Sequence, residues 1–67
     1  MAIIKVIEIL SDSKTSWEDA AKNAVAEASK TVKNIKSAYV QEQSCVVKDG
    51  NVEAFRVNVK ISFAVGS

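Results

Sequence analysis

The chain contains no histidine and no proline, and only one cysteine, Cys45, among its 67 residues. A single cysteine cannot form a disulfide within the chain, and a structural zinc site needs about four nitrogen or sulfur ligands. A domain of this length buries only about 60% of the surface that its unfolded chain exposes, so it is marginally stable alone. Disulfides, metals and oligomerisation are the usual means of compensation, and oligomerisation is the one that this composition leaves open.

Charge of one sign is not concentrated in any part of the chain, and long apolar runs are absent. Nine basic and eight acidic residues give a net charge of +1, and both signs are interspersed. We therefore expect no nucleic-acid partner and no membrane surface as a partner. No apolar run approaches the roughly 20 residues of a membrane span, and we expect no signal peptide. The sequence predicts one domain, residues 1–67, in the reducing cytoplasm.

What the chain does have is a long alternating pattern near its C-terminal end. Apolar residues occupy every second position from Phe55 to Val65, and the positions between include Arg56, Asn58, Lys60 and Ser62. This pattern is about twice as long as a typical strand of roughly 5–6 residues. A short chain with one helix has little of its own to cover so much sheet. We therefore expect the chain to complete itself by self-assembly.

A strand, a polar connector and a helix are predicted upstream. Ile3–Leu10 is mostly β-branched and predicts a strand, and Ser11–Lys14 predicts a connector. Thr15 with Glu18 and Ser16 with Asp19 are two overlapping helix starts, and Ser16 is favoured as the N-cap because Trp17 then begins the apolar stripe. Lys30 and Lys33 are expected at the end of the helix, where they complement the macrodipole. Apolar residues follow at helical spacing: Trp17, Ala20, Ala21, Ala24, Val25, Ala28, Val32 and Ile35. Because this stripe is mostly alanine, a curved sheet can approach the helix closely.

Two further strands complete the predicted fold. Period-two alternation returns from Ser37 to about Lys48, and Asp49–Gly50 then predicts a type I′ hairpin turn. The predicted class is α+β, with a β-α-β-β protomer whose three-stranded antiparallel sheet wraps around one helix.

No group of residues indicates catalysis. Glu18 and Asp19 stand where helix caps belong. Cys45 has no flanking base that would make it a thiolate, and we expect it to lie buried or half-buried in a strand. Asp12, Glu18 and Asp19 could supply oxygen atoms to calcium, but their spacing matches no EF-hand loop, so the metal ligands stay undefined. Trp17 is expected to join the connector to the sheet. We expect a protein that is not an enzyme.

The polar face of the last two strands is the most suggestive surface. Ser37, Tyr39, Gln41 and Gln43 alternate on one side of the first strand, and Arg56, Asn58 and Lys60 on one side of the second. Such a face is either simply solvated or forms a subunit interface or a surface that lines a ligand site. If it faces away from the helix, Arg56 and Lys60 lie at subunit contacts or line the interior of an assembly.

The order of these pieces resembles the dodecin family over about residues 3–65. The resemblance is carried by five segments: Lys5–Ile9, Ser16–Ala21, Thr31–Ile35, Asp49–Gly50 and Phe55–Phe63. It implies a hollow homododecamer of cubic symmetry with channels on its three-fold axes. It also implies a storage protein that is not an enzyme, in which flavins stack in pairs between tryptophans of two-fold-related subunits.

Two positions of the family's flavin site differ in this chain. The stacking tryptophan corresponds to Ser37, and the glutamine that binds the isoalloxazine corresponds to Arg56. Tyr39 is the neighbouring ring on the same face. The resemblance thus predicts a small-ligand storage protein in which a flavin (FMN, riboflavin or FAD) would contact Ser37, Tyr39 and Arg56. The alternative is a calcium-binding or purely structural dodecin shell, since a calcium-binding dodecin is among the similar proteins.

Overall fold

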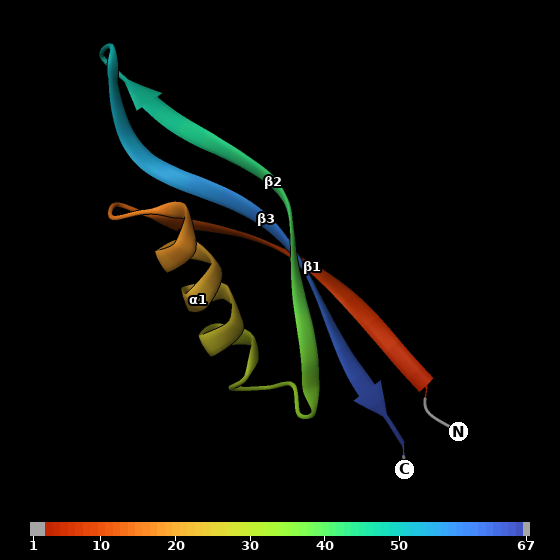
Figure 1. The fold of residues 1–67 in the computed structure, drawn as a ribbon. Coiled ribbons are helices and arrows are strands. Elements are labelled where there is room, and N and C mark those ends of the chain that lie inside the picture. Colours follow the sequence, from red (N-terminus) through yellow and green to blue (C-terminus); the bar gives the residue numbers. More distant parts are fainter. Residues whose placement is uncertain (1–2, 67) are drawn as a thin grey trace.

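The long alternating segment forms the central strand of an antiparallel sheet. The computed structural model describes residues 3–66, in the order β1 (Ile3–Ser13), α1 (Trp17–Ala28), β2 (Ile35–Lys48) and β3 (Asn51–Val65) (Figure 1). β3 lies between β1 and β2 and pairs antiparallel with both. The predicted α+β class and β-α-β-β order are confirmed.

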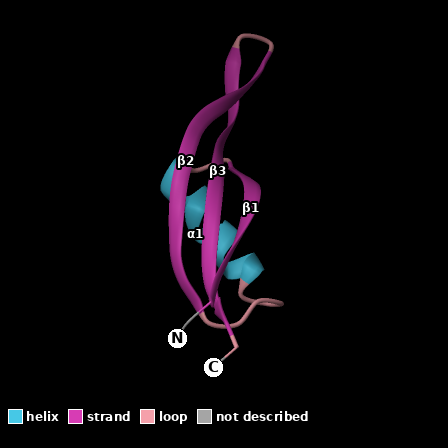
Figure 2. Ribbon diagram, turned by 90° about the vertical axis from the view of Figure 1, so that its right-hand side faces the viewer, coloured by secondary structure: helices cyan, strands magenta, loops and turns pink. Residues whose placement is uncertain are grey.

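The core lies between α1 and one face of the sheet, which curves around the helix (Figures 1 and 2). Val57, Val59 and Ile61 of β3 have no exposed surface. They pack against the helix residues Ala20, Ala24 and Ala28, which are also buried. Small side chains on the helix let its axis approach the sheet closely, as the alanine stripe predicts.

The helix begins as predicted but ends earlier. Ser16 is the N-cap, and its hydroxyl accepts a 3.0 Å hydrogen bond from the backbone N–H of Asp19. The stripe was expected to continue through Val32 to Ile35, and that prediction is wrong, because α1 ends at Ala28. Ile35 instead begins β2 opposite Phe63, where it packs against the core from the sheet. Burial of Ile35 in the sheet thus overrides its helical spacing.

The predicted placement of lysines in the last helical turn is also wrong. Lys30 and Lys33 lie after the C-cap Ser29, in the segment that leads to β2. Asn34 in this segment has a φ of 64°, a left-handed conformation that asparagine tolerates better than most residues. Its carbonyl accepts a 3.1 Å hydrogen bond from the Ala64 N–H, which ties the segment to the end of β3.

β1 is longer than predicted, because the expected connector Ser11–Lys14 mostly belongs to the strand. Residues 11–13 pair with residues 55–57 of β3, so a neighbouring strand satisfies their backbone groups. The buried Ser13 ends the strand. Its hydroxyl donates to Asp19 Oδ2 at 2.7 Å and accepts from the Thr15 N–H at 2.9 Å. Asp19 therefore connects the start of the helix to the end of β1, in agreement with its expected place at the helix cap.

The hairpin turn has the predicted geometry. Asp49 and Gly50 have φ values of 53° and 77°, and type I′ turns require positive φ at both central residues. β2 starts at Ile35, two residues before the predicted start at Ser37, and ends at Lys48 as expected.

Trp17 joins the start of the helix to both strands of the hairpin. Its ring packs edge-on against Phe55 of β3, with 5.1 Å between ring centroids and 73° between planes. Its indole N–H donates a 2.9 Å hydrogen bond to the carbonyl of Ser44 on β2. Trp17 was expected to join the connector to the sheet. It fixes the start of the helix, directly after that connector, to β2 and β3 of the sheet.

A single chain is extended for its mass. Its accessible surface is 4883 Å², whereas a compact monomer of 7.2 kDa would expose about 4,100 Å². Its radius of gyration is 13.7 Å against about 11 Å for a compact domain of this length, and its longest extent is 50 Å. The extra surface belongs to a sheet that one helix cannot cover.

Candidate functional site

The face of the sheet that points away from α1 carries the polar residues of β3. We call it the outer face. Since directly paired residues of antiparallel strands share a face, its cross-strand pairs on the β1 side are Glu8–Lys60, Leu10–Asn58 and Asp12–Arg56. On the β2 side, Ser37 pairs with Ser62 and Tyr39 with Lys60. Arg56 and Lys60 thus point away from the protomer core, as predicted. All three predicted ligand residues lie on this face.

Arg56 is already engaged within the chain. Its Nε and Nη2 atoms donate to the two carboxylate oxygens of Asp12 at 2.7 and 3.0 Å, and both side chains are 44% exposed. The hydrogen bond from Arg56 lowers the pKa of the Asp12 carboxyl, and the same contact raises the pKa of Arg56. A ligand that used the guanidinium would share it with Asp12 or displace that carboxylate.

Ser37 and Tyr39 form a second part of the outer face. The hydroxyl of Ser37 is hydrogen-bonded to that of Ser62, directly across the strand pair. Tyr39 is 65% exposed beside the ammonium-bearing Lys60. This end of the outer face therefore offers an accessible ring, two hydroxyl groups and a cation.

One protomer does not bring the predicted ligand residues together. Tyr39 pairs with Lys60, which is four residues from Arg56 along β3, or about 13 Å. Ser37 pairs with Ser62, six residues from Arg56, or about 20 Å. The binding role of Ser37, Tyr39 and Arg56 stays a prediction, and within one protomer these residues are spread along the outer face.

The predicted grouping of Gln41 and Gln43 with Ser37 and Tyr39 is wrong. The register of β2 shifts between Val40 and Glu42, so Gln41 lies at the bulge and Gln43 pairs with the buried Val57. Gln43 is therefore on the helix side of the sheet, and Glu42 takes the outer-face place opposite Asn58. After a bulge of one residue, the following side chains of the strand lie on the opposite faces from those that simple alternation predicts. The sequence pattern gives no indication of the bulge.

Sequence reasoning also missed the role of Asn58. Its side-chain N–H donates to Glu8 Oε2 at 2.7 Å. Its side-chain oxygen is buried and has no hydrogen-bond partner in the described part of the chain. Asn58 thus binds the carboxylate of Glu8, the cross-strand neighbour of Lys60. Only the cross-strand register could have indicated this contact.

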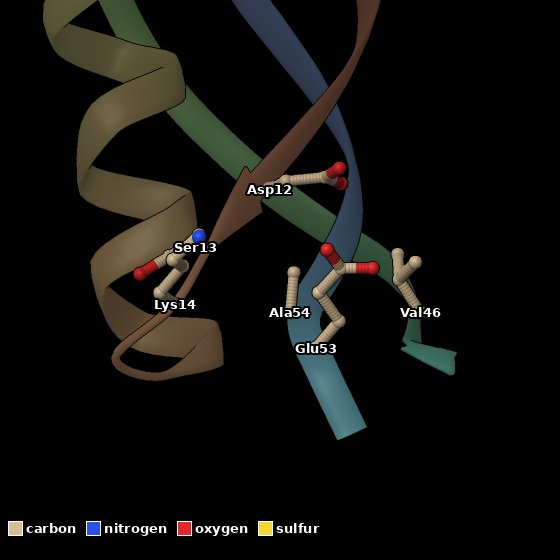
Figure 3. Close-up of a pocket in the computed structure, with 6 residues that line it drawn as sticks. All are labelled: Asp12, Ser13, Lys14, Val46, Glu53 and Ala54. Atoms are coloured by element: carbon tan, nitrogen blue, oxygen red, sulfur yellow. The ribbon is translucent and has the colours of Figure 1, made fainter. Parts of the chain in front are cut away.

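A hollow of about 400 Å³ lies where β1 ends beside the hairpin (Figure 3). Its lining is mixed, with two carboxylates, from Asp12 and Glu53, that point into the same space. Across residues 3–66, no three side chains of histidine, cysteine, aspartate or glutamate come together as a metal-binding group would require. A calcium ion takes six to eight oxygen ligands, more than the two carboxylates of this hollow supply.

Two other sequence features have simple placements. Cys45, expected to be at least half-buried in a strand, is exposed in the single chain. It pairs with Phe55, the residue that packs against Trp17 at the start of the helix. The helix α1 is too short and too polar to cross a membrane, and it is the one helix within residues 3–66.

Comparison with known proteins agrees with this architecture. The family model described as Dodecin matches residues 3–66, nearly the whole chain. The chain belongs to the dodecin family. The calcium dodecin of Mycobacterium tuberculosis is 40% identical to this dodecin over 63 residues, which are 94% of this chain and 89% of that protein.

Solved structures agree at the level of the fold. The structure of the M. tuberculosis calcium dodecin, described as having a novel calcium-binding site, has a TM-score of 0.85 at 38% identity and covers 96% of this dodecin and 91% of that chain. A dodecin from Streptomyces coelicolor has a TM-score of 0.92 at 26% identity, with 98% and 94% covered. A protein from Thermus thermophilus reaches 0.92 at 22% identity, with 100% and 98% covered.

Proposed function

We propose that this dodecin is a non-enzymatic cytoplasmic protein that assembles as a hollow homododecamer and holds a small ligand between its subunits. The observation that carries the proposal is the uncovered outer face of the sheet in a chain that exposes 4883 Å². A marginal 67-residue domain gains most from burying such a face against copies of itself. The non-enzymatic role is supported by a chain without histidine, in which acids and cysteine have no catalytic partner.

Calcium is the ligand that we favour. The relative at 40% identity is named a calcium dodecin, and the likeness covers 94% of this chain. Asp12 and Glu53 already share a hollow, and Glu8 and Glu42 lie on the outer face. Since residues 3–66 of one protomer bring no three acidic ligands together, the ion would be held by carboxylate and carbonyl oxygens from two or more copies.

A flavin is the second candidate, and the exposed ring of Tyr39 is what favours it. A tyrosine on the outer face can stack against an isoalloxazine, and Lys60 beside it can meet a phosphate. Ser37 supplies no ring at the position where the family has tryptophan. Stacking is worth roughly 1–3 kcal/mol per ring, so binding would be weak compared with that of a tryptophan-bearing dodecin.

Native mass spectrometry of protein purified without added ligand tests the proposal first. A species of about twelve times the 7.2 kDa chain mass is expected, and any additional mass identifies the ligand as calcium ions or a flavin. A monomer or dimer at micromolar concentration would overturn the assembly and with it the shared ligand site.

Titrations then separate the two ligands. Calorimetry with calcium should release or absorb heat and raise the melting temperature if calcium is bound. For flavin, quenching of its fluorescence should be weak in the wild type and strong in the Ser37→Trp/Arg56→Gln variant, which restores the family's two residues. Ser29→Trp, at the end of the helix, is the matched control and should leave quenching unchanged. A shell that responds to neither ligand would leave only the purely structural version.

A further inference from the structure

We propose that the outer face binds a planar aromatic anion, that is, an aromatic ring that bears a carboxylate or a phosphate. Lys60 meets the charge of this ligand, and Tyr39 meets its ring. Asn58 is a positioning residue, because it holds the neighbouring acid Glu8. The inference rests on the proposed role in holding a small ligand, and it assigns the charge of that ligand to Lys60 in place of Arg56.

The two cations of the outer face are not equally available to a ligand. Arg56 donates from Nε and Nη2 to the carboxylate of Asp12, at 2.7 and 3.0 Å, so its charge is already neutralised. Lys60 is exposed, and within residues 3–66 no carboxylate oxygen lies within 4.0 Å of its Nζ atom. An ammonium group without a counter-ion attracts an anion more strongly than a neutralised pair does. Lys60 is therefore the cation that an anionic ligand can use.

The acid that would neutralise Lys60 is bound by another residue. Glu8 lies directly across from Lys60 in the pairing of β1 with β3. The side-chain N–H of Asn58 donates to Glu8 Oε2 at 2.7 Å, which draws this carboxylate along the sheet toward Arg56. Glu42, the other nearby acid, lies opposite Asn58 and thus on the same side of Lys60. The other side of Lys60 along the outer face is left open to an anion.

That open side of Lys60 offers a ring and two hydroxyl groups. Tyr39 is the cross-strand neighbour of Lys60 and is 65% exposed, and directly paired residues have Cβ atoms about 4.5–5.5 Å apart. This spacing suits a ligand whose charged group is attached directly to its ring. Ser62 lies two residues beyond Lys60, about 7 Å along β3, and its hydroxyl is hydrogen-bonded to that of Ser37. A bond between two hydroxyls uses one of their protons, so the other can be donated to an anion.

Three naphthalene compounds test the inference: naphthoate, naphthyl phosphate and the uncharged naphthalenemethanol. Fluorescence anisotropy of the naphthalene ring, at one fixed ionic strength, gives the dissociation constant of each compound. The wild type should bind at least one of the anions more tightly than the alcohol. Lys60→Gln should weaken binding of that anion about tenfold, as loss of a hydrogen bond to a charged group implies, and should affect the alcohol much less. Lys22→Gln removes an exposed charge from α1 and is the matched control.

A second set of variants tests the positioning role of Asn58. Asn58→Leu keeps a similar side-chain volume but releases Glu8 to neutralise Lys60, so the preference for the anion over the alcohol should fall. Adding Glu8→Gln to Asn58→Leu should restore the preference, which a merely structural role of Asn58 does not predict. Circular dichroism verifies that each variant folds.

The outcomes separate this inference from the proposed function. Equal affinity of the wild type for the anions and the alcohol, or no binding of any of them, overturns the inference, whereas an assembled species in native mass spectrometry would still support the proposed shell. A larger loss with Arg56→Gln than with Lys60→Gln assigns the charge to Arg56 and also overturns the inference. A monomeric wild type that prefers the anions overturns the proposed assembly but supports this site, since all of its residues belong to one chain.

Discussion

At the scale of single residues, the pairing of Arg56 with Asp12 is the most consequential contact. The sequence pattern predicts a strand at Arg56 but a connector at Asp12. Because β1 continues to Ser13, Asp12 lies directly opposite Arg56, although the two are 44 residues apart in the sequence. The two hydrogen bonds give the planar geometry that arginine forms with a carboxylate. The pair is half-exposed, so its main effect is to orient Arg56 on the outer face rather than to stabilise the fold strongly.

Replacing Asp12 by Asn is expected to remove a pH-dependent part of the stability. The hydrogen bond from Arg56 lowers the pKa of Asp12 in the folded chain below its ordinary value of 3.8. A carboxyl group with a lowered folded pKa stabilises the fold above its unfolded pKa, and this contribution disappears as pH falls through the folded pKa. The wild type should therefore exceed Asp12→Asn in free energy of unfolding at neutral pH, and the difference should shrink below about pH 4.

Urea unfolding of both proteins at a series of pH values measures this difference. Glu53→Gln is the control, because across residues 3–66 Glu53 forms no ion pair within 4.0 Å. A difference between wild type and Asp12→Asn that stays constant from pH 7 to acid would show that the pair does not act through ionisation of Asp12.

At the scale of the elements, the alanine face of α1 sets the distance between helix and sheet. Ala20, Ala24 and Ala28 recur at every fourth position and meet the fully buried residues of β3. Interiors are packed at the density of organic crystals, so a larger side chain there must displace the helix. On the exposed side of the same helix, the size of a side chain is not restricted in this way.

Enlarging the middle alanine should therefore be costly. Ala24→Leu inserts extra methylene groups between α1 and β3 and is expected to lower the free energy of unfolding by about 1–3 kcal/mol. The matched control is Ala26→Leu on the exposed side of the same helix, with an expected change within about 0.5 kcal/mol. Urea midpoints of the two variants give the comparison, and equal midpoints would mean that the helix is not held closely against the sheet.

At the scale of the whole molecule, the protomer is a long curved sheet with one helix on one of its faces. Its core consists of few residues and its chain can form no internal disulfide, so the proposed assembly would contribute much of its stability. The predicted ligand residues on the outer face are separated within one protomer, and the proposed shared site depends on the same association.

The melting temperature is accordingly expected to rise with protein concentration. Association that occurs only in the folded state stabilises that state by mass action, whereas the unfolding of an isolated domain does not depend on concentration. Differential scanning calorimetry over about a hundredfold range of concentration measures the effect. A melting temperature that is constant over this range, together with a monomeric mass, would mean that the chain completes its core without partners.

The sequence by itself determined the order of the elements, the cap at Ser16, the type I′ turn at Asp49–Gly50 and the outward side of β3. These features depend on local backbone preferences and on period, which neighbouring residues are sufficient to specify. Only the tertiary structure decided that Ile35 leaves the helix for the sheet and that β1 continues to Ser13, because both depend on burial and pairing with β3.

The candidate site divides in the same way. Alternation alone placed Arg56 and Lys60 on the face away from the helix, since a strand turns every second side chain to one side. The bulge after Val40 and the partners of Arg56 and Asn58 depend on the register between strands far apart in sequence. Register is set by long-range pairing, so the separation of Arg56 from Tyr39 became visible only when the strands were placed side by side.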